Sequence, residues 1–74
     1  MHLTSAVHLK AVLAAVVTRS RVRISNRNGW AQGIEGIALG YRPGWGSVKV
    51  GFIDDDGSYT GDWTVVPVLH VETT

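Results

Sequence analysis

The hydrophobic pattern of this chain changes its period once, near residue 20, and this change sets the order of its elements. Apolar side chains three and four positions apart line one side of residues 4–18. They are Leu9, Val12, Leu13, Val16 and Val17. This spacing predicts an amphipathic helix, with Thr4 or Ser5 as its N-cap. From Arg21 onward, apolar residues alternate with polar ones, as they do in half-buried strands.

Five short strands are expected after the helix. They cover residues 21–25, 33–41, 47–52, 59–65 and 69–71. The segments between the first four strands are rich in the turn residues Asn, Asp, Pro and Gly, and Gly36 and Gly40 predict a bend or bulge within the second strand. One helix and five strands at about ten-residue spacing predict a mainly β fold. We expect a single domain over residues 1–74, with a helix at 4–18 and a small five-stranded β-barrel, or a tightly curled sheet, at 21–72.

Residues 22–71 resemble the SH3-like small β-barrel superfamily in its KOW- and Tudor-like forms. The resemblance rests on Val22-Arg23-Ile24, on Gly33-Ile34-Glu35-Gly36-Ile37, on Val48-Lys49-Val50 with the Asp-Gly hairpin, and on Val65-Val66-Pro67-Val68-Leu69. It implies an SH3-like barrel with a short turn before the last strand. The aromatic groove of peptide-binding SH3 domains is missing, and the leading helix is not part of the family pattern. The superfamily binds RNA, DNA, peptides or methyl-lysine, so the resemblance leaves the function open.

The chain has 74 residues and no cysteine, which leaves room for one core and excludes disulfides and thiolate metal sites. Stability must then come from tight packing or self-association. The lack of cysteine fits a reducing compartment. We therefore expect a cytoplasmic protein, or one of an infected cell or virion, as for a small viral or accessory bacterial protein. The apolar run 11–17 is shorter than the about 20 residues that span a bilayer, and no signal-peptide cleavage pattern follows it, so no membrane association is expected.

Charge is divided along the sequence. Residues 1–50 carry all seven Lys and Arg and a single acid, a net charge of +6, whereas residues 51–74 carry five acids. The basic half predicts contact with nucleic acid or another anionic partner through phosphate-binding cations and an indole. The candidate residues are Arg19, Arg21, Arg23, Arg27, Arg42, Lys49 and Trp45. The alternative is a solvated strand face paired internally, with Glu35 balancing Arg21 or Arg23 across the sheet.

The helix face opposite the apolar stripe has almost no charge, which suggests a surface for a second copy or a protein partner. The candidate interface residues are His8, Ala11, Ala15, Thr18 and, on a loop, Trp30. Trp30 and Trp45 could instead plug the barrel or form an aromatic cage. Phe52 and Trp63 are expected to pack in the core.

No arrangement of residues in the sequence predicts catalysis. His2, His8 and His70 lack metal-binding spacing, and no serine occupies a nucleophile elbow. The run Asp54-Asp55-Asp56-Gly57 lacks the ligand pattern of a calcium loop and is typical of a hairpin turn. We expect no catalytic residue, metal or cofactor, although symmetry between copies could still build a catalytic pore. The sequence favours a non-catalytic binding or assembly module that acts through homo-oligomerisation or a protein partner, with a nucleic-acid-binding barrel as the alternative.

Overall fold

The computed structural model describes residues 4–25 and 33–73. Helix α1 (Thr4–Thr18) is followed by β1 (Arg21–Ile24), β2 (Glu35–Arg42), β3 (Ser47–Ile53), β4 (Tyr59–Pro67), the 3-10 helix η1 (Val68–His70) and β5 (Val71–Thr73). The predicted class, mainly β with an N-terminal helix, is confirmed. The predicted turn at 26–29, Arg27, Trp30 and the capping side chains of Thr4 and Ser5 lie outside the described part.

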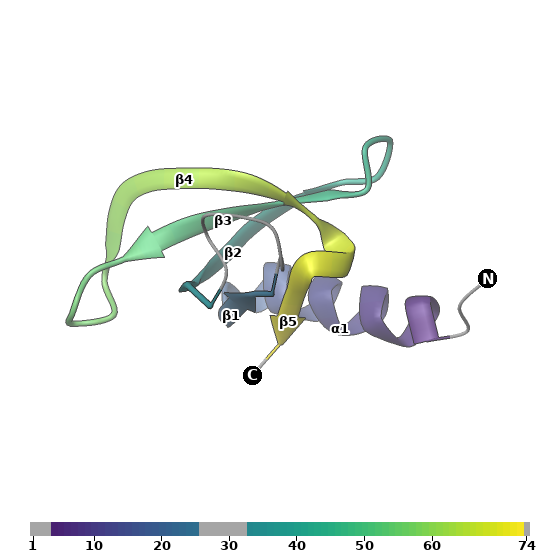
Figure 1. Cartoon of the computed structure of the whole chain (residues 1–74), viewed down its shortest axis with the longest axis horizontal. Helices are drawn as coiled ribbons and strands as arrows, with labels where there is room; N and C mark the ends of the chain where they lie inside the picture. Colours follow the sequence, from purple (N-terminus) through teal and green to yellow (C-terminus); the bar gives the residue numbers. More distant parts are fainter. Residues whose placement is uncertain (1–3, 26–32, 74) are drawn as a thin grey trace.

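The five strands form one antiparallel sheet in the order β4-β3-β2-β1-β5. Figure 1 shows β2, β3 and β4 arching over α1, with β5 crossing beside β1. Strands β4 and β5 are the two edges, so the hydrogen-bonded ladder of the described strands does not close into the expected complete barrel. Strand β5 has only three residues, which pair with Val22, Arg23 and Ile24 of β1. It therefore extends the sheet at β1 without reaching β4.

The hydrophobic core lies between α1 and one face of the sheet, here called the inner face. Its buried residues are Val12, Ala15, Val22, Ile24, Ala38, Val48, Val50, Val66 and Val71. The helix contacts β2, β5 and η1. Burial of each valine side chain contributes about 1.5–3 kcal/mol to folding. The small residues Ala15 and Ala38 leave space for the helix to approach the sheet closely.

The orientation of the helix differs from the predicted one. Val12 and Ala15 are buried, whereas Leu13 and Val17 of the predicted stripe are 37% and 82% exposed. The helix is rotated so that Ala15, together with Val12, faces the sheet and Leu13 and Val17 face away from it. The last residue of the helix is Thr18, and the next residue, Arg19, has a φ of 52°, which allows Ser20 N to donate to Ala15 O at 2.8 Å. This is a Schellman C-cap with arginine in place of the usual glycine.

A bulge in β2 confirms the irregularity predicted from Gly36 and Gly40. Ala38 pairs with Val50, but Gly40 pairs with Lys49, so Leu39 is an extra residue in the ladder. Because side chains alternate between the two faces, one extra residue reverses the alternation. Ala38 points into the core. After the bulge, Tyr41, an odd-numbered residue, packs on the core, and the even-numbered Arg42 faces the other side of the sheet.

Trp63 does not pack in the core as the sequence suggested. It pairs with Gly51 on β3, and its side chain is 51% exposed. Val50 and Thr64 form the neighbouring pair, and Val50 is fully buried. Trp63 consequently lies on the opposite, outer face of the sheet, while Phe52 is half-buried.

Candidate functional site

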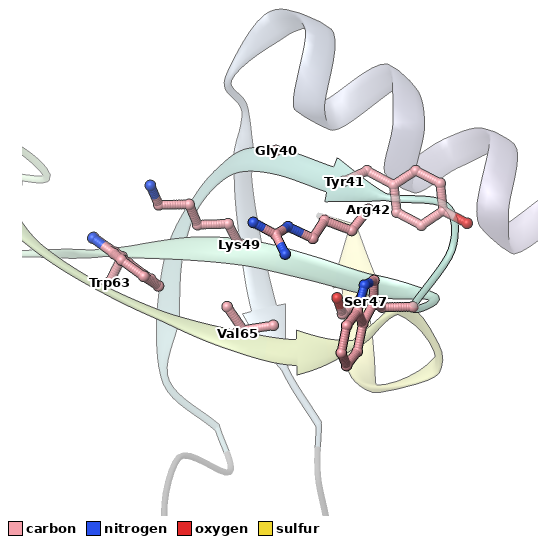
Figure 2. A pocket seen from close by; sticks show the side chains of 8 residues that line it. Gly40, Tyr41, Arg42, Ser47, Lys49, Trp63 and Val65 are labelled. Carbon is pink, nitrogen blue, oxygen red and sulfur yellow. The ribbon is translucent and has the colours of Figure 1, made fainter.

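A shallow pocket lies on the outer face of the sheet, where β2, β3 and β4 run side by side (Figure 2). Its volume is about 620 Å³, within the range of about 300–1,000 Å³ that small-ligand sites occupy. It is lined by Gly40, Tyr41, Arg42, Trp45, Ser47, Lys49, Trp63 and Val65. We call this the outer pocket.

The register of the strands explains why these side chains meet. Lys49 lies at the centre, directly opposite Gly40 on one side and Val65 on the other. Opposite residues in an antiparallel sheet project from the same face. Arg42 pairs with Ser47 and joins this face only because the extra residue Leu39 has reversed the alternation of β2.

Cations and indoles lie together in the outer pocket. The Nζ atom of Lys49 lies 4.2 Å from the centroid of the Trp63 ring, a cation–π contact. In Figure 2 Arg42 and Lys49 both extend over β3. No aspartate or glutamate belongs to the lining. The pocket is therefore positive, with aromatic surface beside its charge.

Trp45 reaches the pocket from the turn between β2 and β3. The carbonyl of Arg42 accepts hydrogen bonds from Trp45 N at 3.2 Å and Gly46 N at 2.9 Å, which holds the turn closed. Gly46 has a φ of 61°, so this position suits glycine. The Trp45 side chain is 78% exposed. A large apolar side chain held in solvent by a well-defined turn is a candidate contact anchor.

The basic residues singled out in the sequence are divided between two places. Arg42, Lys49 and Trp45 come together in the outer pocket, whereas Arg19, Arg21 and Arg23 lie at the helix end and on β1. There, Nη1 of Arg21 lies 3.5 Å from Oε1 of Glu35, an ion pair that the sequence offered as the alternative reading. Arg23 stands opposite both Glu35 and Glu72 in the ladder. The cations of β1 are thus set among carboxylates.

The residues predicted to form an interface on the helix are likewise placed differently from what the sequence suggested. Ala15 is only 6% exposed and belongs to the core, so its side chain is not available to a partner. His8 is half-buried, and its Nε2 donates to Val68 O at 2.9 Å, because a carbonyl can only accept. Ala11 is half-buried, and the exposed Thr18 bonds back to Ala14 O at 3.0 Å. The large apolar side chains exposed on the described part of α1 are instead Val7, Leu13 and Val17.

Strand β4 forms a long free edge of the sheet. It has nine residues, and Tyr59, Trp63 and Val65 along it are 43%, 51% and 51% exposed. Val68 N donates to Gly46 O at 2.8 Å, which fixes the phase of the ladder with β3. Since antiparallel pairs alternate, the peptide groups of Val66 and Thr64 face β3, and those of Val65 and Trp63 face away from it. No described strand lies on that outer side.

The acidic run is a hairpin turn, as predicted. Oδ1 of Asp54 accepts hydrogen bonds from Asp56 N at 2.9 Å and Ser58 N at 3.0 Å, and Gly57 takes a φ of 84°. The described residues contain no group of three or more His, Cys, Asp or Glu able to hold a metal ion. Within the same residues, no helix is both long and apolar enough to cross a membrane.

Sequence reasoning found three of the eight pocket residues and missed the remainder, notably Trp63 and Val65. The available signal was the sequence alternation of β4, which places these two residues on one face. Deciding which face required the pairing of Trp63 with Gly51. That register depends on tertiary packing and cannot be read from one strand alone.

Comparison with known proteins adds no relative: no protein-family model, curated protein or solved structure matches this chain.

Proposed function

We propose that this chain is a non-catalytic assembly module that pairs with a second copy of itself through the free edge of β4. The observation that carries the proposal is the length and composition of this edge. Natural proteins protect sheet edges with short strands, prolines, bulges or charges, especially lysine. Between Trp63 and Val66, β4 has no charge and no proline, and its single aspartate, Asp62, stands beyond that segment.

A two-fold arrangement satisfies the free peptide groups of both copies. With the axis at Thr64, Trp63 of one subunit stands opposite Val65 of the partner subunit, and each pair exchanges two N–H···O bonds. The indole and the β-branched side chain then form a cross-strand pair on the outer face. Pro67, which has no N–H, ends the pairing segment.

Charge is compatible with pairing of identical strands. In the register above, Asp62 stands opposite Val66 of the partner subunit, and the two Asp62 residues are four positions apart along the strands. This separation is about 13 Å, longer than the Debye length of about 8 Å at physiological ionic strength. Like-charge repulsion at the interface is therefore weak.

The SH3-like barrel is the fold family that we assign to the module. Its support is the bent five-stranded sheet together with η1, which stands directly before the last strand where the resemblance places a short turn. The leading helix covers the core and is additional to that family pattern.

Sedimentation across a dilution series tests the assembly. We expect a dimer that dissociates on dilution. Val65→Pro removes the N–H that points away from β3 and leaves the bonds to β3 in place. Two intersubunit hydrogen bonds are lost, each contributing about 1 kcal/mol, so the dissociation constant should rise about 30-fold or more. Far-UV circular dichroism should be unchanged.

Two variants serve as controls. Val65→Thr keeps the N–H and the β-branched shape, so it should still dimerise. Val17→Lys places a charge on the exposed apolar side of α1 and should have no effect. A wild-type monomer at all concentrations would refute the proposal, as would a dimer that is broken by Val17→Lys and not by Val65→Pro. Species that keep growing beyond the dimer would exclude two-fold pairing.

A further inference from the structure

From the side chains of the outer pocket we infer that it is a binding site for single-stranded nucleic acid. A base would stack on an indole, and the adjoining phosphates would contact Arg42 and Lys49. This inference does not depend on the proposed self-association. Trp63 and Val65 belong both to the pocket lining and to the proposed edge pairing, whereas Arg42, Lys49 and Trp45 lie on β2, β3 and the β2–β3 turn, away from the edge.

The two tryptophans supply the stacking surface. Trp45 is 78% exposed and Trp63 is 51% exposed, so both are far more exposed than an indole packed in a core. Their rings reach the pocket from different elements, the β2–β3 turn and β4. Base–aromatic stacking accepts any base, since every base has a π-face. The pocket therefore predicts binding with little sequence preference.

The two cations supply the phosphate contacts. Arg42 and Lys49 lie on adjacent strands, two residue pairs apart in the ladder, because Lys49 pairs with Gly40 and Arg42 with Ser47. Such diagonal neighbours on one face are about 7–8 Å apart, a separation that their long side chains can adjust to neighbouring phosphates of an extended single strand. The lining contains no carboxylate to neutralise them.

The ligand class follows from the combination of charge and aromatic surface. A duplex hides its base faces in its own stack, so it would use the cations and leave the indoles unused. An acidic peptide would likewise satisfy Arg42 and Lys49 without stacking on Trp45. Only a strand with accessible bases uses both features, and DNA and RNA share this chemistry.

Fluorescence anisotropy with labelled oligomers of about 12 nucleotides tests the inference, since known sites span about 4–16 nucleotides. Oligo(dT) and oligo(U) are compared with a duplex of equal length and with poly-glutamate, from 50 mM to 200 mM salt. We expect binding of the single strands that weakens as salt rises. Trp45→Ala should weaken it about 5- to 100-fold. The double variant Arg42→Gln with Lys49→Gln should reduce the salt slope by up to about 1.4.

Matched controls separate the pocket from general charge attraction. Arg23→Gln and Lys10→Gln each remove one cation elsewhere and should leave the affinity within about twofold of wild type, because their charges lie outside the pocket. Absence of binding to both oligomers at 50 mM salt would overturn the inference. So would equal binding of the duplex or of poly-glutamate, or a loss on Arg23→Gln as large as that on the double variant Arg42→Gln with Lys49→Gln. A preference for oligo(U) over oligo(dT), or the reverse, would identify the natural strand.

Discussion

Two glycines of β2, four residues apart, have different structural roles. Gly36 is buried, and a Cβ on it would meet the backbone oxygen of Gly51 and lie 2.7 Å from Cγ1 of Val50. Gly40 has nothing within 4 Å of its Cβ position. The first glycine thus allows β2 and β3 to approach one another, whereas the second has no steric need to be glycine.

Substitution of these glycines by alanine should therefore give opposite results. Gly36→Ala should lower the free energy of unfolding by about 1–3 kcal/mol, because a backbone atom blocks the new methyl group. Gly40→Ala should be neutral or should stabilise the protein by up to about 1 kcal/mol, through a less flexible unfolded chain. Urea denaturation of both variants measures the difference. Equal stability of the two would show that the close contact at Gly36 is relieved at no cost.

Asp54 organises the β3–β4 turn from its side chain. Its Oδ1 accepts two backbone N–H groups, and its own N donates to Ser58 O at 2.9 Å. Asp54→Ala should lower the free energy of unfolding by about 1–2 kcal/mol, because two donors lose their acceptor. Asp54→Asn keeps an oxygen there and should lose less. Asp55→Ala, at an exposed neighbouring position, is the control. Chemical denaturation that ranks Asp55→Ala as the most damaging would contradict this role.

At the scale of elements, the sequence predicted the helix and all five strands, but not their relative orientation. Periodicity marks which residues alternate, and it does so correctly for Val22, Ile24, Val48 and Val50. It cannot specify how far a helix is rotated about its axis when it meets the sheet, so Leu13 was expected inside and Ala15 outside. The same limit applies to β4, where Trp63 alternates correctly but on the outer face.

A side-chain hydrogen bond joins the helix to a segment near the other end of the chain. Nε2 of His8 donates to the carbonyl of Val68 in η1. His8→Ala should lower the free energy of unfolding by about 1 kcal/mol, since the carbonyl of a half-buried residue loses its donor. His8→Gln retains an N–H and should recover part of the loss. Thermal unfolding measures both, and sedimentation should show no change in assembly. A change in assembly without a change in stability would instead favour the predicted interface role.

In the whole molecule, the basic and acidic halves of the sequence are not separated from each other in the fold. Strand β5 carries Glu72 from the acidic half and pairs with the basic strand β1, where Arg23 stands opposite it. The guanidinium of Arg21 lies against Gly57 of the acidic hairpin, 2.7 Å from where a Cβ would be. An antiparallel sheet that returns its last strand to its first mixes the two halves. Sequence charge therefore marked the basic residues alike, and only the fold separates Arg42 and Lys49 of the outer pocket from the arginines of β1.

The extra residue Leu39 lets Ala38 and Tyr41, three positions apart in the sequence, both face the core. Deletion of Leu39 would leave Ala38 opposite Val50 and Gly40 opposite Lys49 in direct succession, so the ladder would become regular and Tyr41 and Arg42 would keep their faces. If Leu39 were instead kept and paired as an ordinary strand residue, the guanidinium of Arg42 would turn toward the core and the phenol of Tyr41 toward solvent. The surface chemistry of β2 thus depends on the bulge itself and not on the number of residues in the strand.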